Sequence, residues 1–214
     1  MRTIQKLKYQ LMAKSRERKY NEFLKLTSLD SKSTILDVGV ADKEFSPYDN
    51  YLEKVYPHQS KITALSIQET SEFSQKYPMI DTVIYGGGEF PFPDKKFSAV
   101  HSNAVIEHVG NKKDQVFFIK EMARCGRQFF FSTPAKEFLF EIHTNLPFLH
   151  WLPKSFFDYL LIKTGKGWAS GNYMHLLTKR ALHHLLQDAQ IKNYQIITHR
   201  ILGLPYQYVV FGSS

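Results

Sequence analysis

The chain has 214 residues, 43% of them hydrophobic and 22% charged, a balance that excludes a disordered chain and fits a folded globular protein. Its one cysteine, Cys125, excludes an internal disulfide and favours a reducing compartment, and no run approaches the roughly 18 apolar residues of a membrane span. The formal net charge of +8 is uneven, because residues 1–20 carry seven basic and one acidic side chain, a net +6, which leaves +2 beyond them. We expect one cytoplasmic domain over residues 1–214.

The N-terminal segment, residues 3–27, predicts a helix, because apolar side chains recur there at helical spacing. These side chains are Leu7, Leu11, Tyr20, Phe23 and Leu24. We therefore expect residues 1–30 to form a basic helical extension. Two interpretations stay open: a solvated basic helix, or an arm that binds phosphate or anionic lipid.

Five apolar segments predict the strands of a buried sheet. They are residues 33–39, 61–67, 82–85, 98–102 and 128–132. Helical patterns fall between several of them, and Val116, Ile119 and Ala123 share one helix face before the fifth strand. Strands that alternate with helices predict a parallel sheet covered on both faces.

The C-terminal part of the chain predicts one more helix and a hairpin. Thr178 is suited to cap a helix in which Leu182 and Leu185 begin an apolar face. Two strands follow at residues 195–198 and 208–211, with Gly203 and Pro205 between them. The expected fold is α/β and doubly wound, with a mostly parallel seven-stranded sheet and a C-terminal antiparallel hairpin.

Ligands bind such a sheet at the carboxyl ends of its strands, where the strand order reverses. Three segments near these ends carry residues suited to chemistry. They are L-D-V-G-V-A-D at residues 36–42, E-F-P-F-P-D-K-K-F-S-A-V at 89–100 and S-N-A-V-I-E-H-V at 102–109. A glycine such as Gly39 at a strand end lets the backbone approach a ligand that a Cβ would exclude.

In this order and at these separations, the three segments resemble the class I S-adenosylmethionine-dependent methyltransferases, whose fold is Rossmann-like. The match is to the branch marked by an L-P-F-x-D-x-x-F-D loop followed by an E-H pair, and it spans residues 30–135. The continuation S-T-P at 132–134 and E-I-H-T-N-L-P-F-L-H-W-L-P at 141–153 is similar to bacterial members associated with polysaccharide or lipopolysaccharide synthesis.

The resemblance implies S-adenosyl-L-methionine as the cofactor and assigns residues to its parts. The loop under the methionine part would contain Asp37, Gly39 and Ala41. The ribose would lie beside Ser66, and the adenine beside Gly86, Gly87 and Glu89. The methionine side below the reactive sulfonium would be lined by Ser102 and Asn103.

Several positions depart from the family's pattern. Ala41 and Lys43 stand where the family usually has glycines. Ser66 replaces the acid that binds the ribose hydroxyls, and Gly86 replaces an aspartate that faces the adenine. Each lost charge-assisted hydrogen bond weakens cofactor binding by about 1.5–3 kcal/mol. An alternative is therefore a non-catalytic Rossmann-like protein with a degenerate cofactor site, unless a nearby acid such as Glu89 substitutes.

Methyl transfer to a hydroxyl also needs a base, and histidine suits that role at neutral pH. His143, just after the fifth strand, is the first candidate, followed by His101 and His108. The resemblance puts Glu107 and His108 near the site entrance, where a structural or helix-capping pair is the alternative. No histidine cluster has recognisable zinc-ligand spacing, so we expect no metal.

Residues 136–176 are rich in aromatic side chains. They predict a lid that covers an apolar acceptor or leans on a membrane, or a helical insertion that packs its own small core. The expected function is O-methylation of a small-molecule, sugar or lipid-linked glycan acceptor, with peripheral contact to the inner face of the membrane. A nucleic-acid methyltransferase is a further alternative, but the near-neutral charge beyond residue 20 and the absence of an N-P-P-Y sequence disfavour it.

Overall fold

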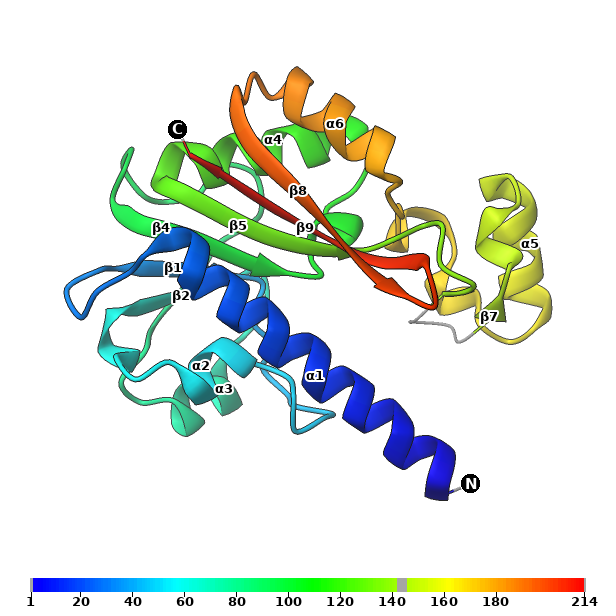
Figure 1. Ribbon diagram of the computed structural model, residues 1–214, viewed down its shortest axis with the longest axis horizontal. Helices are drawn as coiled ribbons and strands as arrows, with labels where there is room; N and C mark the ends of the chain where they lie inside the picture. The colour runs from blue at the N-terminus through cyan, green and yellow to red at the C-terminus, as the bar shows by residue number, and fades with distance from the viewer. Residues whose placement is uncertain (1, 142–145, 214) are drawn as a thin grey trace.

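The computed structural model describes residues 2–141 and 146–213, which form a seven-stranded sheet with helices on both faces (Figure 1). The strand order is β3-β2-β1-β4-β5-β9-β8. The strands are β1 (Ile35–Val38), β2 (Ile62–Ser66), β3 (Asp81–Ile84), β4 (Phe97–Asn103), β5 (Gly126–Pro134), β8 (Asn193–Ile201) and β9 (Leu204–Ser213). The first five are parallel to one another, and β9 runs antiparallel to β5 and β8. The predicted Rossmann-like fold with its terminal hairpin is confirmed.

Helices cover the sheet between these strands. The α-helices are α1 (Arg2–Thr27), α2 (Tyr51–Val55), α3 (Ser71–Lys76), α4 (Lys112–Cys125), α5 (Lys154–Lys163) and α6 (Lys179–Asp188). Short 3₁₀ turns lie at Gln59–Lys61, Ile106–His108, Leu149–Trp151, Gly167–Ala169 and Gly171–Tyr173. A two-residue ribbon pairs β6 (Phe140–Glu141) with β7 (Leu146–Pro147). The long stretch between β5 and α6 is therefore an insertion into the alternating pattern.

The alternation of side chains along β1 divides the core into two layers. Leu36 and Val38 pack with the apolar faces of α4 and α6. Ile35 packs in the other layer, with side chains from α1, α2 and α3. Asp37, two residues on, points to that same side, so a carboxyl group lies at the margin of an apolar layer.

The two helices of the first layer begin at capping residues. Asn111 accepts a hydrogen bond from the Lys113 backbone N–H, and Asp114 accepts one from the Asn111 backbone N–H, which makes a capping box at the start of α4. At the start of α6 the Thr178 hydroxyl accepts a hydrogen bond from the Ala181 N–H, so the predicted cap is confirmed.

The second half of α1 belongs to the domain body, although the sequence predicted a basic extension. Phe23 is fully buried against Phe130 of β5. Ser15 donates to the Gln207 side chain, and Glu22 lies 2.8 Å from His199 Nε2 on β8. The first half of α1 runs past the edge of the sheet (Figure 1). The middle turns of α1 thus pack against the edge of the sheet.

The terminal hairpin differs from the prediction at its turn. Pro205 was expected between the strands, but it lies within β9, paired with Arg200 of β8. The register shifts between His199 and Arg200, directly beside it. Proline has no N–H to give to a ladder, and a local irregularity is where a strand accommodates it.

The insertion between β5 and α6 packs its own small core. Phe157 and Leu161 on the inner side of α5 contact Ala169 and Met174. The Lys136 N–H donates to the Leu177 carbonyl, which holds the two ends of the insertion together. The insertion lies beyond the carboxyl end of β5, at the right of Figure 1.

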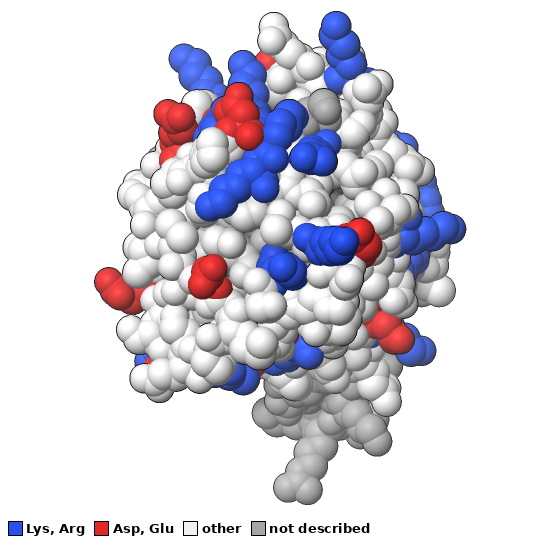
Figure 2. All heavy atoms as spheres, turned by 90° about the vertical axis from the view of Figure 1, so that its left-hand side faces the viewer, with Lys and Arg blue, Asp and Glu red and all other residues white. Residues whose placement is uncertain are grey.

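The opposite end of the molecule carries a mixture of charges. Figure 2 views it from the left-hand side of Figure 1, and Lys and Arg side chains gather in its upper part with Asp and Glu among them. In the part of the chain that the structure describes, no helix combines the length and apolar character that crossing a bilayer requires.

Candidate active site

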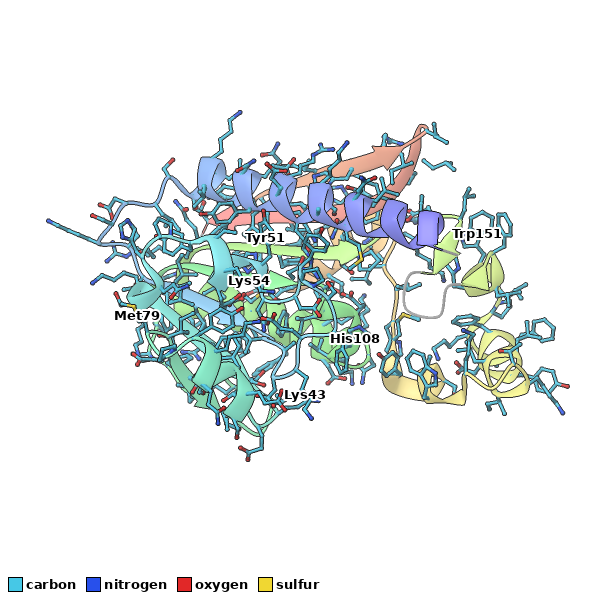
Figure 3. All side chains as sticks on the ribbon, turned by 90° about the horizontal axis from the view of Figure 1, so that it is seen from below. Lys43, Tyr51, Lys54, Met79, His108 and Trp151 are labelled. Atoms are coloured by element: carbon cyan, nitrogen blue, oxygen red, sulfur yellow. The ribbon has the colours of Figure 1, made fainter. Side chains whose placement is uncertain are left out.

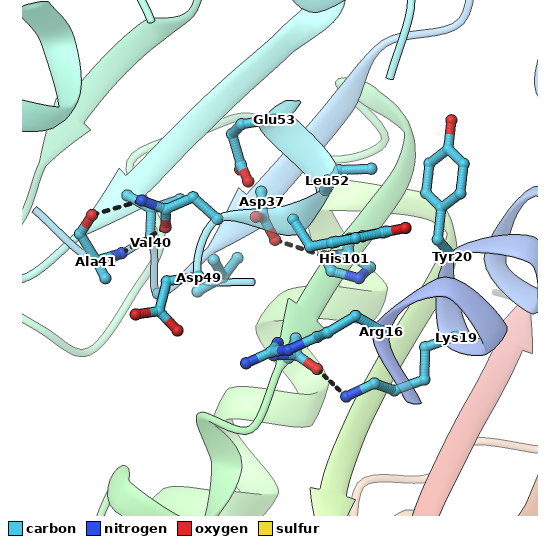
Figure 4. Close-up of a pocket in the computed structure, with 15 residues that line it drawn as sticks. Arg16, Lys19, Tyr20, Asp37, Val40, Ala41, Asp49, Leu52, Glu53 and His101 are labelled. Carbon is cyan, nitrogen blue, oxygen red and sulfur yellow. Dashed lines mark hydrogen bonds and ion pairs between the residues drawn. The ribbon is translucent and has the colours of Figure 1, made fainter. Parts of the chain in front are cut away.

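A pocket lies where α1 crosses the carboxyl ends of β1 and β4. Its walls come from the middle of α1, the end of β1 and the loop after it, the start of α2, and the end of β4 (Figure 4). The strand order reverses between β1 and β4, since β2 follows β1 on one side and β5 follows β4 on the other. This is the switch point at which doubly wound sheets bind ligands.

Gly39 forms the floor of the pocket, and its backbone has a conformation that favours glycine. Its φ is +90°, and a Cβ built there would lie 2.4 Å from Val105 Cγ2. Val105 belongs to the loop after β4, so glycine is required because two loops pack closely. The sequence predicted glycine at this position because the backbone approaches a ligand closely. The structure adds a second reason, the close packing of the two loops.

The loop after Gly39 is held by Asn50. The Asn50 side chain accepts from the Ala41 N–H and donates to the Ala41 carbonyl. These two hydrogen bonds from the Asn50 side chain hold the loop in place of a glycine-rich turn. Lys43 points away from the pocket, because its Nζ pairs with Glu72 at 3.2 Å and its side chain is 63% exposed (Figure 3). The lysine therefore leaves the pocket open.

Three buried titratable groups form an acidic cluster on one wall. His101 Nδ1 lies 2.6 Å from Asp37 Oδ1, and the His101 ring stacks on Phe130. Glu53 of α2 faces Asp37 (Figure 4), and neither of its carboxyl oxygens has a partner of standard hydrogen-bond geometry among the described residues. We call Asp37, Glu53 and His101 the acidic cluster.

Burial sets the protonation of this cluster. It raises the pKa of Asp37 to about 6 and lowers the pKa of His101 to about 4, so the imidazole is neutral at pH 7. Burial and the nearby Asp37 raise the pKa of Glu53 well above its ordinary value. Two buried carboxyls with one neutral histidine therefore favour a state in which a proton is kept on the carboxyl pair.

Two cationic side chains of α1 form the opposite wall. Lys19 is 6% exposed, and its Nζ donates to Asn103 Oδ1, which also accepts from the Ser132 hydroxyl. Burial lowers the pKa of Lys19 well below its ordinary value, and the neighbouring Arg16 lowers it further. Buried cations are costly without an anion. The pair is therefore suited to bind one.

The predicted adenine side of the sheet edge is built differently. A Cβ added to Gly86, Gly87 or Gly88 would meet no atom within 4 Å. Ser66 accepts from the Gln68 N–H, and Glu89 is exposed, 3.9 Å from Arg124. These residues lie outside the pocket lining and leave an open, glycine-lined surface beside it.

The predicted site residues fall into three groups. Asp37, Gly39, Ala41, His101 and Asn103 line the pocket. Ser66, Gly86, Gly87, Glu89 and Ser102 lie along the same sheet edge but not in the lining, and the Ser102 hydroxyl donates to the Val38 carbonyl. His143 lies outside the described residues.

Glu107 and His108 hold the insertion against the body. Glu107 is fully buried, accepts from the Thr133 hydroxyl at 3.0 Å, and accepts the His175 N–H at its carbonyl. His108 Nδ1 lies 2.7 Å from the Tyr173 carbonyl and therefore donates to it. Figure 3 shows His108 at the edge of the body that faces the insertion. These contacts are structural ones, and the catalytic prediction for the pair stays a prediction.

Sequence reasoning did not assign Arg16, Lys19 or Glu53 to the site. Charged residues on a basic helix are ordinarily solvated, and nothing local marks Arg16 and Lys19 as buried. One signal was available: Lys19 and Phe23 are four residues apart and share a helix face. If Phe23 enters the core, Lys19 must lie at its margin.

Comparison with known proteins places this geometry in a family. A family model described as "Methyltransferase domain" matches residues 12–196. A methyltransferase structure from Methanosarcina mazei, described as SAM-dependent, is 17% identical with a TM-score of 0.53, over 87% of this chain and 94% of that one. A geranyl diphosphate C-methyltransferase from Streptomyces coelicolor is 9% identical with a TM-score of 0.61, over 96% and 80%.

A third similar structure is a magnesium protoporphyrin IX methyltransferase from Synechocystis, solved with bound SAH. It is 12% identical with a TM-score of 0.57, over 96% of this chain and 82% of that one. Among curated proteins, none matches the sequence.

Proposed function

The chain belongs to the methyltransferase-domain family and is an S-adenosylmethionine-dependent methyltransferase, and we propose that it methylates an oxygen of a small-molecule, sugar or lipid-linked glycan acceptor. The assignment to members that act in polysaccharide synthesis is part of this proposal, and so is contact with the inner face of a membrane. The observation that carries the cofactor site is the pocket with cations on one wall and carboxyls on the other.

This pocket fits the amino-acid end of the cofactor, which carries a carboxylate and an ammonium group. Arg16 and Lys19 would face the carboxylate, and Asp37 with Glu53 would face the ammonium (Figure 4). The cavity measures about 150 Å³, less than the roughly 300–1,000 Å³ of pockets that enclose a whole drug-sized ligand. It therefore takes one end, and the nucleoside would extend over the open glycines after β3.

S-adenosylmethionine supplies a methyl group on a positively charged sulfur, so the protein's main task is alignment. Gly39 and Asn50 hold the loop after β1, and Asn103 is held by Lys19 and Ser132 at the end of β4. Both elements lie at the carboxyl edge of the sheet. The methionine end would thus be held between the loop after β1 and the end of β4, with the acceptor entering from the side of the insertion.

An oxygen acceptor must also lose a proton. We assign this to His143, with His108 as the second candidate, and Glu107 positions the loop that carries His108. His101 is not assigned this role, because it is buried beside Asp37 and a pKa of about 4 makes its imidazole a weak proton acceptor. Removal of a general base lowers kcat by about 10²–10⁴-fold. His143→Ala is expected to lower kcat in this way without weakening cofactor binding.

The proposed reaction is tested with methyl-labelled cofactor and the full chain. Separate incubations contain nucleotide sugars, polyprenyl-phosphate sugars and transfer RNA. The expected result is alkali-stable label in a sugar-containing product, because a methyl ether resists alkali. Label in transfer RNA, or on a carbon atom of the acceptor, would contradict O-methylation.

A further inference from the structure

The insertion exposes an unusual share of the molecule's large apolar side chains. Seven of the 16 exposed large hydrophobic side chains among the described residues fall between residues 148 and 173. We call them the aromatic patch: Phe148, Trp151, Phe156, Tyr159, Ile162, Trp168 and Tyr173, each 40–62% exposed. Such a concentration of exposed large apolar side chains in one segment is typical of a binding surface.

The aromatic patch is organised rather than scattered. Its rings form three close pairs, Phe148 with Trp151, Phe156 with Tyr159, and Trp168 with Tyr173, at centroid separations of 5.2, 6.2 and 5.2 Å. Two of these pairs include tryptophan, and two include tyrosine. Side chains of these two types favour the boundary between a lipid bilayer and water, because each has an apolar body and a polar tip.

Helix α5 is apolar on both of its sides. Phe157 and Leu161 fill the insertion's own core, which leaves Phe156, Tyr159 and Ile162 on the outer face at 50–62% exposure. A helix face made of large apolar side chains ordinarily packs against another surface. The outer face of α5 therefore lacks a covering surface in the isolated chain.

The charged residues around the aromatic patch favour one kind of binding partner. Residues 148–173 contain three lysines and one acid, Asp158, which is paired with Lys154. Lys163 lies over the Tyr159 ring, 5.7 Å from its centroid, so its ammonium emerges beside the aromatic surface. The first turns of α1, from the strongly basic residues 1–20, lie at the same end of the molecule (Figures 1 and 3). Aromatic side chains bordered by positive charge complement an anionic bilayer surface.

We propose that the aromatic patch docks the protein on an anionic membrane surface. The inference rests on the proposed function in one respect, since a lipid-linked acceptor would then enter from the docked side. His108 and Glu107 join the insertion to the loop after β4 through Tyr173 and His175. Docking would therefore place the bilayer next to the edge of the sheet that holds the cofactor pocket.

Tryptophan emission reports docking directly, because both tryptophans of the chain, Trp151 and Trp168, belong to the patch. The full chain is mixed with vesicles of phosphatidylcholine alone or with about 30% phosphatidylglycerol, which gives the vesicle surface a negative potential. We expect sedimentation with the anionic vesicles, a blue shift of the emission, and quenching by brominated lipid. Equal binding to both vesicle types, or binding without an emission change, would overturn the proposal.

A triple variant with Phe156→Ser, Tyr159→Ser and Ile162→Ser removes the outer face of α5 and keeps both tryptophans. It is expected to weaken vesicle binding at least about tenfold, since three large apolar side chains that would enter the bilayer boundary are lost. The matched control carries Phe45→Ser, Met79→Ser and Leu202→Ser, three exposed side chains on the body at 87%, 61% and 98% exposure. Unchanged binding by the first variant, with both variants folded by circular dichroism, would overturn the proposal.

Two other occupants of the patch give different results. A second copy of the chain would produce a concentration-dependent dimer that the triple variant abolishes, with no vesicle binding. Contact through the mixed-charge face of Figure 2 would give sedimentation with unchanged tryptophan emission. Either result overturns membrane docking by the patch. Cofactor binding, measured by calorimetry without vesicles, reports separately on the proposed function.

Discussion

The two ends of the proposed cofactor site differ in how they are built. After β1 and β4, the pocket is closed by α1 and lined by titratable side chains on both walls, the half-buried Arg16 and the buried Lys19 opposite the buried Asp37 and Glu53. After β2 and β3, the edge is open, with three glycines and no buried acid at Ser66 or Gly86. The two missing acids, at Ser66 and Gly86, belong to the open end, whereas Ala41 and Lys43 replace glycines in the loop after β1.

This difference shows where binding free energy would come from. Charge-assisted hydrogen bonds in a buried pocket are roughly twice as strong as neutral ones, and the open end offers backbone and exposed side chains instead. The charged pocket can thus compensate for the missing ribose and adenine acids. An apparently degenerate motif is then compatible with cofactor binding, provided that the amino-acid end dominates the affinity.

The largest expected effect follows from removing the cationic wall. Arg16→Met with Lys19→Met should lower affinity for S-adenosylmethionine at least about 100-fold, because two charge-assisted hydrogen bonds of about 1.5–3 kcal/mol each are lost. Isothermal calorimetry measures it. Lys25→Met, on the exposed end of α1, is the matched control and should bind normally. Equal affinities for the double variant and the control would show that α1 does not take part.

The next effect concerns the floor of the same pocket. Gly39→Ala should lower the free energy of unfolding by about 3 kcal/mol, because φ is +90° and the new Cβ overlaps Val105. Gly86→Ala, at the open end, should change it by less than about 1 kcal/mol, since its Cβ meets nothing. Urea denaturation compares the two variants. A similar loss for both would mean that the ends do not differ in packing.

A third effect is the pH dependence of stability. The folded-state pKa of Asp37 is raised to about 6, so the folded state binds more protons than the unfolded one and stability falls as pH rises from about 4 to 6. The pKa of His101 is lowered from 6.5 to about 4, so its contribution rises with pH over nearly the same window. The two slopes oppose each other in the wild type.

Single variants should separate these slopes. His101→Gln leaves the Asp37 term, so stability should fall by up to about 2–3 kcal/mol from pH 4 to 6 relative to the wild type. Asp37→Asn removes the Asp37 contribution, so its stability should rise with pH relative to the wild type. Thermal unfolding measured at several pH values tests this. Parallel profiles for all three proteins would contradict the assigned protonation states.

The smallest effect is expected at the open end. Glu89→Gln should change cofactor affinity by less than about threefold, because the carboxylate is 77% exposed and solvent screens its interactions. The same calorimetric titration measures it. A loss above tenfold would mean that Glu89 replaces the missing ribose or adenine acid, and that the open end contributes more than proposed.

The sequence predicted those helices and strands whose side-chain periodicity can be read from neighbouring residues. The strand segments, the helix of α1 and the Thr178 cap all follow from side-chain spacing within a few residues, and the structure has them. Pro205 was placed in the turn, because the irregularity that accommodates it beside His199 and Arg200 leaves no local pattern.

The site was predictable only in part, because burial depends on contacts far apart in the chain. Asp37, Gly39 and Asn103 were found because they follow strands. Lys19 was treated as solvated, since its partner Asn103 lies 84 residues away. Glu53 is buried by β1 and β4 rather than by its own short helix. A charged residue in a five-residue helix gives no sequence signal of such burial.

The central claim, that the charged pocket dominates cofactor binding, is tested most directly by comparing two ligands on the wild-type chain. Calorimetry is performed with S-adenosylmethionine and with 5′-methylthioadenosine, which lacks the amino-acid end. S-adenosylmethionine should bind at least about 100-fold more tightly, which corresponds to about 3 kcal/mol of interactions with that end. Affinities within threefold of each other would contradict the claim and move the main binding surface to the open glycines.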